Sequence, residues 1–444
     1  MADANRALDR VLGSLVSVLR HPLAACTAFL LVHLWLGNLN LHSSQSPMTD
    51  VTYVYKFWVE QFVVEGFRVG VDSQWVYPVV AFVPMLLAYA FGPEFYGATW
   101  LSMVLVLNLV ALGFLTGWGR RRDRVNVAWW WIFFLVALGP IALGRIDSVS
   151  VPLAIIGMLL LASRPRAAAI VLAIATWMKV WPAALLAAVI IASRHRVRVL
   201  VAITATSLAI IATALLMGSG ANVFSFITQQ AGRGLQIEAP VSTVWLWLAA
   251  SGSKDTFVYY DSDILTYQVD GDGTAAAAAL MTPLLGFAVA VVSFLGIRAV
   301  RRGANVAQLL PPLALALVTA FIVFNKVGSP QFESWLAVPV IVGLMSALGG
   351  GRSFRVPASL ALVIAAMTQV IYPTFYPLLL GLDPMMLALI TARNLLLVAL
   401  LIWAIVCVVR AGAPAAEPDL LHPDVEHADL AEPSTWPLAS PLQP

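Results

Sequence analysis

Long apolar stretches, separated by short polar segments, run along almost the whole chain. A helix needs about 20 apolar residues to cross a bilayer and satisfies its own backbone groups there. Strand-type alternation is absent, so the pattern predicts an all-α polytopic membrane protein and not an outer-membrane barrel. Twelve crossings are expected, at residues 23–42, 95–117, 126–143, 148–163, 167–179, 181–192, 199–217, 275–297, 304–324, 330–348, 356–372 and 385–409.

Clusters of basic residues set the threading, because Lys and Arg concentrate in cytoplasmic segments. Placing all the clusters inside requires twelve crossings and puts both termini in the cytoplasm, with the protein in the plasma membrane. The clusters are Arg6/Arg10/Arg20, Arg120/Arg121/Arg122/Arg124, Arg164/Arg166, Arg194/Arg196/Arg198, Arg298/Arg301/Arg302, Arg352/Arg355 and Arg410.

The segment 77–92 is also apolar, but it carries Pro78 and Pro84. Counting it as a crossing would place the RRRDR cluster at 120–124 outside the cell. We therefore expect it to lie in, or dip into, the outer leaflet.

The rest of the chain divides into loops and ends. Residues 43–76 and 218–274 form two larger extracytoplasmic loops, and residues 1–22 resemble an amphipathic lead-in helix. Residues 412–444 are rich in Pro, Ala and acidic side chains, which predicts a disordered cytoplasmic tail. Residues 1–411 then form a single transmembrane domain.

The composition supports this class. Hydrophobic residues make up 60% of the chain and charged residues 11%, far from a soluble globular protein. Cys26 and Cys407 each lie in an apolar stretch, so neither a disulfide framework nor a cysteine metal site is expected. The net charge of +3 follows from topology. We expect no nucleic-acid partner.

Lys179 interrupts an apolar stretch, where a charge costs about 3 kcal/mol even on lenient insertion scales. The stretches 167–179 and 181–192 are each only about 20 Å long as helices. Both are flanked by cytoplasmic arginines, so together they cross and return. Pro182 breaks the turn between them. Lys179 is therefore predicted at the apex, facing outward.

Unusual polar residues collect on one face of the membrane. Eight basic residues lie outside the clusters, and the threading puts seven on the outer face: Lys56, Arg68, Arg145, Lys179, Arg233, Lys254 and Lys326. The eighth, Arg393, lies about two turns below that face, beside Asn394. The same face holds Asp50, Asp147, Gln236, Glu238, Asn325, Gln331 and Glu333. The asymmetry indicates a site that opens outward.

Each of these residues also has a structural interpretation. Asp50 begins an amphipathic stretch, where it is either a helix N-cap or a general base with Tyr53 nearby. In GRID (144–147), Arg145 and Asp147 either pair with each other or line the site.

Two further stretches offer ligands. Arg233 suits a phosphate, and Gln236 and Glu238 suit sugar hydroxyls, unless their loop is simply solvated. In NKVGSPQF (325–332), Lys326 either binds an anion or snorkels to the interface.

Six motifs in order resemble glycosyltransferase family 87, of the GT-C superfamily of membrane glycosyltransferases. They are Thr49–Asp50, VYPVV around Tyr77–Pro78, GRID at 144–147, MKVWP at 178–182, RGLQIE at 233–238 and SPQFESW at 329–335. The resemblance covers about residues 23–410. Two positions depart from the family pattern: Val79 stands where a second proline is usual, and Ala239–Pro240 where a serine often follows.

The resemblance implies a GT-C-type bundle of about twelve helices and an inverting transferase that works at the extracytoplasmic face. It also implies an enzyme without a cofactor that is independent of metal ions or depends on them only weakly, so no metal site is expected. Its donor is a polyprenyl-monophosphate sugar and its acceptor a glycolipid or lipoglycan in the membrane. The general base maps onto Asp50. The donor phosphate is assigned to Lys179, Arg233, Lys326 and, from position alone, Arg393; the sugar and acceptor contacts are assigned to Tyr53, Tyr77, Asp147, Gln236, Glu238 and Gln331.

Three alternatives remain open at this point. The donor sugar is most simply mannose, although a polyprenyl-phosphate arabinose used by an arabinofuranosyltransferase fits equally well. A transporter or flippase for a lipid-linked solute would spread its polar residues across the midplane, whereas here they gather on one face. A structural scaffold would leave Lys179 and Arg393 without a purpose.

Overall fold

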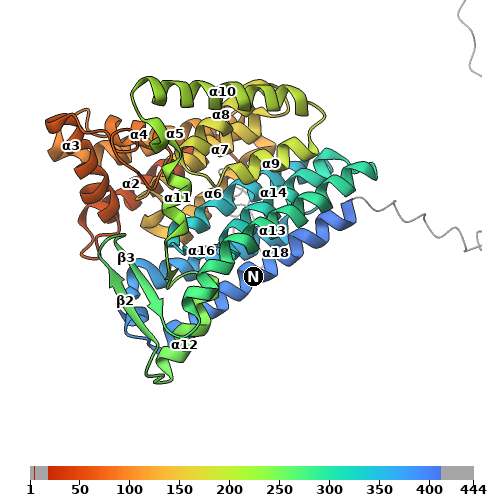
Figure 1. Ribbon diagram of the computed structural model, residues 1–444. Coiled ribbons are helices and arrows are strands. Elements are labelled where there is room, and N and C mark those ends of the chain that lie inside the picture. Colours follow the sequence, from red (N-terminus) through yellow and green to blue (C-terminus); the bar gives the residue numbers. More distant parts are fainter. Residues whose placement is uncertain (1–4, 6–18, 412–444) are drawn as a thin grey trace, which may run out of the picture.

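The computed structural model describes residue 5 and residues 19–411 (Figure 1). Most of the predicted lead-in helix 1–22 and the whole predicted tail 412–444 lie outside the described residues.

Helices dominate the described chain, and all twelve predicted stretches are helical. The first half contains α2 Pro22–His42, α3 Lys56–Glu65, α4 Phe82–Leu87, α5 Tyr96–Thr116, α6 Val125–Leu138, α7 Asp147–Leu160, α8 Pro165–Met178, α9 Ala183–Ala192 and α10 Arg196–Leu216. The second half contains α11 Ser225–Ala231, α12 Thr243–Ala250, α13 Thr274–Arg301, α14 Val306–Val323, α15 Ala337–Leu348, α16 Arg355–Gln369, α17 Tyr376–Leu380 and α18 Pro384–Ala411.

Within the described residues, nine helical segments are long and apolar enough to cross a membrane. The protein is therefore a polytopic, predominantly α-helical membrane protein. The predicted number of twelve crossings is not confirmed, because α7, α8 and α9 have only 14, 14 and 10 residues. Helix α4, within the apolar segment 77–92, has six residues and is too short to span, as expected.

The structure adds one small sheet, in the predicted loop 218–274, to the predicted all-α architecture. Strands β1 Leu235–Gln236, β2 Phe257–Asp261 and β3 Thr266–Asp270 form an antiparallel sheet in the order β1-β3-β2. The hairpin sequence FVYYDSDILTYQVD is rich in β-formers, with a polar turn between its two halves. Each half has only five residues, so the strand signal is short beside the long apolar helices.

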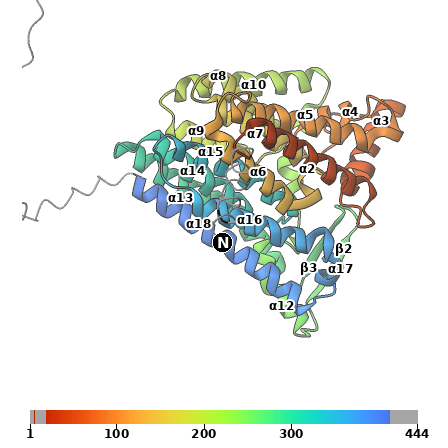
Figure 2. The same ribbon diagram turned by 180° about the vertical axis from the view of Figure 1, so that it is seen from behind.

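The helices pack into a body of roughly triangular outline (Figures 1 and 2). Helix α10 runs along one side, α13 and α18 along another, and the hairpin with α12 lies towards the corner below. The span of α14 is 78% buried and forms the centre, whereas the spans of α10 and α13 are only 17% buried. These peripheral helices therefore present apolar side chains to lipid.

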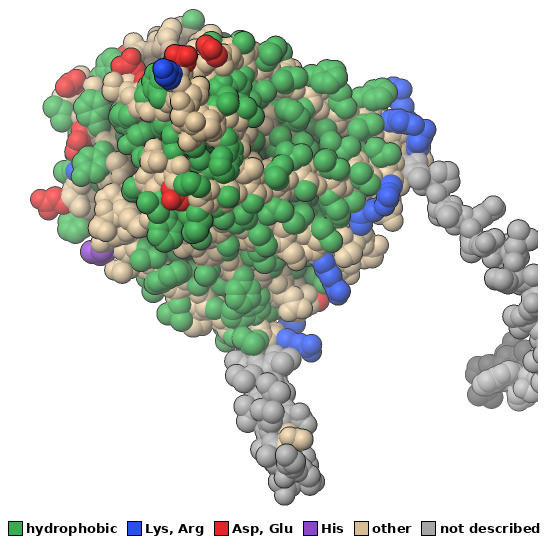
Figure 3. Space-filling view, turned by 90° about the horizontal axis from the view of Figure 1, so that it is seen from below, with side chains coloured by type: hydrophobic (Ala, Val, Ile, Leu, Met, Phe, Trp, Pro, Cys, Tyr) green, Lys and Arg blue, Asp and Glu red, His purple; other side chains and the backbone are tan. Residues whose placement is uncertain are grey.

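The two ends of the bundle differ in charge. The helix ends at His42, Asp147, Met178 and Val323 lead into the turns that carry the predicted site. The arginine clusters within residues 19–411 lie at or beside the opposite helix ends, as the threading requires. In the view from below, most Lys and Arg side chains lie along the right and lower edges and most Asp and Glu side chains along the upper and left edges (Figure 3). Which membrane side each end faces stays a prediction.

Candidate active site

Asp50 lies at the start of a π-helical turn, Asp50–Tyr55, that leads into α3. Its Oδ2 lies 3.0 Å from Arg145 Nε; the Asp50 side chain is 40% exposed and the Arg145 side chain 8%. The N-cap position belongs to Thr49, and no side chain caps this turn. The capping interpretation of Asp50 is thus wrong. Its carboxylate pairs with Arg145 on one side and is exposed on the other.

Arg145 is fixed by four groups, three of which are distant in the sequence. Its Nη1 donates to the carbonyls of Pro47 at 2.7 Å and Gly144 at 2.8 Å, and its Nη2 to the Tyr372 hydroxyl at 3.1 Å. Burial alone would lower the pKa of Arg145, but the Asp50 carboxylate and Tyr372 hold it above its ordinary value. The guanidinium is therefore a permanent, rigid support for Asp50.

Asp147 does not pair with Arg145, contrary to the structural interpretation of GRID. Its Oδ2 accepts from Lys179 Nζ at 3.0 Å, and its Oδ1 from Trp335 Nε1 at 2.6 Å. The Asp147 side chain is 1% exposed. The geometry shows it holding Lys179 in place, while its direct contact with a sugar stays a prediction.

Lys179 lies at the apex between two short helices, as predicted. Helix α8 ends at Met178, and the Lys179 backbone turns extended (φ −150°, ψ 135°) before Pro182 caps α9. Its ammonium lies 5.3 Å from the ring centroid of Tyr77 and 5.4 Å from that of Phe332. Aromatic faces attract a cation, so rings and carboxylate together hold the charge in one place.

The RGLQIE loop brings further predicted ligands beside the NKVGSPQF loop. The backbone N–H of Gln236 donates to the backbone carbonyl of Lys326 at 3.1 Å. Burial lowers the pKa of Lys326, and the nearby Arg233 lowers it further. Arg233 is partly buried, and its Nε has no partner within the described structure. Two adjacent cations are a suitable environment for an anion.

Arg393 and Glu238 form a buried ion pair that ties this loop to α18. Arg393 Nη1 lies 3.0 Å from Glu238 Oε2, and Nη2 donates to the Glu238 carbonyl at 2.8 Å. Each side chain is 2% exposed. What the geometry shows is an anchor for the loop, and contact of either residue with substrate stays a prediction.

One of the predicted contacts, Tyr53, differs strongly in accessibility from a nearby tyrosine. Tyr53 is 71% exposed, whereas Tyr55, which the sequence analysis did not select, is 1% exposed. The Tyr55 hydroxyl lies 3.4 Å from the Tyr77 hydroxyl and accepts from the Ile146 amide at 3.3 Å. Both tyrosines lie in the sequence TYVYKFW, and only the register of the π-helical turn determines which of them is buried.

Residues 75–254 match the sequence profile of glycosyltransferase family 87. This match supports the resemblance of the chain to that family. With the membrane helices, the match makes the protein a membrane glycosyltransferase. The comparisons with curated proteins and with solved structures found no significant match.

The family 87 match contains four of the six motifs: Tyr77–Pro78, GRID, MKVWP and RGLQIE. The structure brings these four together with the two outside it, Thr49–Asp50 and SPQFESW. Ion pairs and hydrogen bonds join Asp50 to GRID, GRID to Lys179, and Asp147 to Trp335. The motifs inside and outside the matched segment therefore lie close together in the structure.

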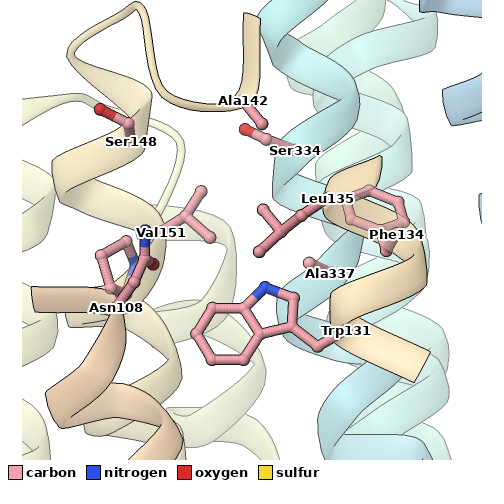
Figure 4. Close-up of a pocket in the computed structure, with 10 residues that line it drawn as sticks. Asn108, Trp131, Phe134, Leu135, Ala142, Ser148, Val151, Ser334 and Ala337 are labelled. Carbon is pink, nitrogen blue, oxygen red and sulfur yellow. The ribbon is translucent and has the colours of Figure 1, made fainter. Parts of the chain in front are cut away.

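Two small cavities flank this place, each of about 10 Å³. The first is lined by Ser148 and Ser334, the neighbours of Asp147 and Trp335 (Figure 4). The second is lined by Glu238, Arg393 and Glu333 among others. Each has room for about one water molecule, so neither is a sugar pocket.

The remaining predicted contact, Gln331, is 8% exposed, two residues before the buried Glu333. Glu333 was noted in the sequence without a role, and its Oε2 has no partner among the described atoms. Within residues 19–411, no group of three or more His, Cys, Asp or Glu side chains is arranged to hold a metal ion.

Proposed function

We propose that this membrane glycosyltransferase moves a sugar, most simply mannose, from a polyprenyl-monophosphate donor to a hydroxyl of a glycolipid or lipoglycan acceptor. The reaction inverts the anomeric carbon, with Asp50 as the general base. The proposed site opens on the extracytoplasmic side of the plasma membrane.

The observation that carries the proposal is the pair of neighbouring ion pairs, Asp50–Arg145 and Lys179–Asp147. The first leaves a carboxylate 40% exposed on a rigid support, as a base needs when it accepts a proton from a bound hydroxyl. The second holds an ammonium among aromatic rings, within the electrostatic reach of Asp50. A single displacement needs a base beside the attacking hydroxyl and a cation beside the leaving phosphate, and these two groups match that requirement.

The proposed step is a single displacement. The acceptor oxygen attacks the anomeric carbon while its proton passes to Asp50, and the bond from that carbon to the phosphate oxygen breaks. The bonding electrons leave with the polyprenyl phosphate, whose growing negative charge Lys179, Arg233 and Lys326 stabilise. Preorganised cations beside a developing charge are usually a large catalytic contribution.

A lipid-linked donor suits the surroundings of the site. Its phosphate would meet Lys179 at the end of α8, while its prenyl tail stays among lipid beside the weakly buried helices α10 and α13. The family match favours such a transferase over a transporter or flippase, because the matched family consists of glycosyltransferases.

The test incubates the purified protein with synthetic polyprenyl-phosphate mannose or polyprenyl-phosphate arabinose and a membrane lipid extract as the source of acceptor. We expect sugar transfer from one of the two donors, and loss of at least about 10²-fold in turnover for Asp50→Ala. The matched control is Asp72→Asn, because Asp72 lies in the same outer loop and pairs only with Arg68. Transfer from neither donor, or full turnover in the Asp50 variant, contradicts the proposal.

A further inference from the structure

The small sheet has one polar face. The strand register places Gln236 of β1 opposite Gln268 of β3, and Gln268 opposite Tyr259 of β2. Side chains of directly paired residues lie on the same side of a sheet. These three residues therefore form one row across the sheet, called here the glutamine row.

The glutamine row carries polar atoms that lack partners. Gln268 is 1% exposed and Gln236 is 3% exposed. Gln268 Oε1 and Gln236 Nε2 are buried and make no hydrogen bond in the described structure. The same holds for Thr266 Oγ1, two residues before Gln268, and for Arg233 Nε at the start of the loop. Buried polar groups are nearly always hydrogen-bonded, so a cluster of exceptions indicates an unfilled ligand position.

The row is held in place rather than loosely packed. Asp261 Oδ2 accepts from Gln268 Nε2 at 2.6 Å, which fixes the direction of the free carbonyl oxygen. The other Asp261 oxygen accepts from the amides of Asp263 and Ile264, so the same carboxylate also closes the hairpin turn.

The opposite, apolar face of the sheet accounts for its packing on the bundle, so the glutamine row is not needed for folding. Leu235 and Val269 are buried there in a cluster with Leu387 and Ile390 of α18. That apolar contact docks the hairpin on the bundle and needs nothing from the glutamines on the other side.

The row runs from the proposed catalytic site to the surface. At its inner end, the backbone N–H of Gln236 donates to the Lys326 carbonyl, and Arg233 lies within electrostatic reach of Tyr77. At its outer end, Tyr259 is 36% exposed. The hairpin starts after residue 254, where the family match ends, so it lies outside the part of the chain that matches the family.

We infer that the glutamine row binds the hydroxyl groups of a neutral sugar in the acceptor glycan, with Gln268 and Tyr259 as specificity-determining residues. This inference rests on the proposed transferase function. Free amide oxygens and N–H groups match the paired donors and acceptors of sugar hydroxyls. The Asp261 carboxylate that binds Gln268 disfavours an anionic ligand at this position, which favours a neutral sugar. Tyr259 offers a ring face on the open side.

The test measures equilibrium binding without donor, so that it is independent of turnover. The full-length protein in lipid nanodiscs is titrated with methyl α-D-mannopyranoside, followed by saturation-transfer NMR, with methyl α-D-arabinofuranoside as the pentose probe. We expect binding of at least one probe, weakened about tenfold by Gln268→Leu and several-fold by Tyr259→Ala. Asp263→Asn, an exposed hairpin residue off the row, is the matched control and should bind as the wild type does.

A second variant keeps the test valid if Gln268→Leu fails to fold. A Cβ at Gly234 would meet Gln268 Oε1, the far end of a flexible side chain. Gly234→Ala should therefore displace the free carbonyl and weaken the probe while the sheet stays folded. Failure of the wild type to bind either probe, or unchanged binding in both folded variants, overturns the inference.

Donor and acceptor sugars are told apart by competition. A non-reactive phosphonate analogue of the donor should leave methyl glycoside binding intact if the row serves the acceptor. Displacement of the probe by the analogue would assign the row to the donor sugar and overturn the acceptor assignment. A wild type that binds the probes but transfers no sugar contradicts only the proposed function.

Discussion

Lys179 offers the sharpest test of the site, because its charge has both a structural and a proposed catalytic use. Replacing it with Met keeps the length of the side chain and removes the ammonium. The remaining Asp147 is then a carboxylate only 1% exposed, with Trp335 Nε1 as its one polar partner. Instability and loss of activity are therefore expected together in Lys179→Met, and the single variant cannot separate them.

The size of the effect follows from the geometry. Two unit charges 3.0 Å apart attract with about 5 kcal/mol at an effective dielectric constant of about 20. Removing one partner of a buried pair typically costs about 3–5 kcal/mol, whereas removing both charges is far less costly. Lys179→Met should thus lose about 3–5 kcal/mol of unfolding free energy. Lys179→Met/Asp147→Asn should lose about 1–2 kcal/mol, because the amide oxygen still accepts from Trp335.

The assay is a double-mutant cycle read in two ways. Chemical unfolding in detergent, followed by tryptophan fluorescence, gives the stability of the wild type, the two single variants and the double variant. Initial rates with the polyprenyl-phosphate donor give turnover and donor KM for the same four proteins. Stability should recover in the double variant, while donor use stays about 10²–10³-fold below the wild type.

Two results would refute this reasoning. If the double variant is as unstable as Lys179→Met, the ion pair is not what makes Asp147 tolerable in the core. If turnover returns together with stability, Lys179 has only a structural role and the donor phosphate is bound elsewhere.

Three further outcomes follow from the structure. Arg145→Lys should lower kcat about 10–100-fold with little change in donor KM. One ammonium cannot replace the forked guanidinium, which binds two carbonyls, a hydroxyl and a carboxylate. A normal kcat would contradict the supporting role of Arg145. Gly328→Ala should sharply lower the unfolding temperature, since its Cβ would overlap the backbone of the RGLQIE loop. Gly286→Ala, where a Cβ meets nothing, is the control and should be neutral or slightly stabilising. Equal effects of the two variants would contradict a close packing of Gly328 against that loop. In a background lacking both native cysteines, Lys254→Cys should label with an impermeant maleimide from outside and Arg121→Cys only after permeabilisation; the reverse would invert the proposed orientation.

The helices and the apex at Lys179 are predictable because their signals are local. Apolar length and flanking arginines are written in consecutive residues, and Pro182 marks the turn directly. The number of crossings is less accessible, since α7, α8 and α9 are too short for length alone to decide.

The partners within the site are not predictable in this way. Proximity in the sequence suggests that Arg145 pairs with Asp147, but residues two apart at a helix start do not face each other. Asp147 turns to Lys179, 32 residues later, and Arg145 to Asp50, far earlier in the chain. These pairings depend on how α7, α8 and the π-helical turn dock.

The glutamine row was missed for a related reason. Gln236 was selected for its place in a motif, but Gln268 has meaning only through its register with Gln236. Pairing between β1 and β3 joins residues about 30 positions apart, and nothing in the short sequence of either strand specifies that register.

The shortness of α8 has a consequence for the membrane itself. Its 14 residues extend only about 21 Å, against a hydrocarbon thickness of about 30 Å. As a membrane-crossing helix, α8 would have a hydrophobic mismatch of about 9 Å, and we expect lipid headgroups and water to sink towards its end and thin the bilayer beside Lys179. The phosphate of the proposed lipid-linked donor would then reach the lysine along the depressed surface of its own leaflet. On this proposal, the membrane boundary comes down to the site and the lipid does not have to leave the bilayer.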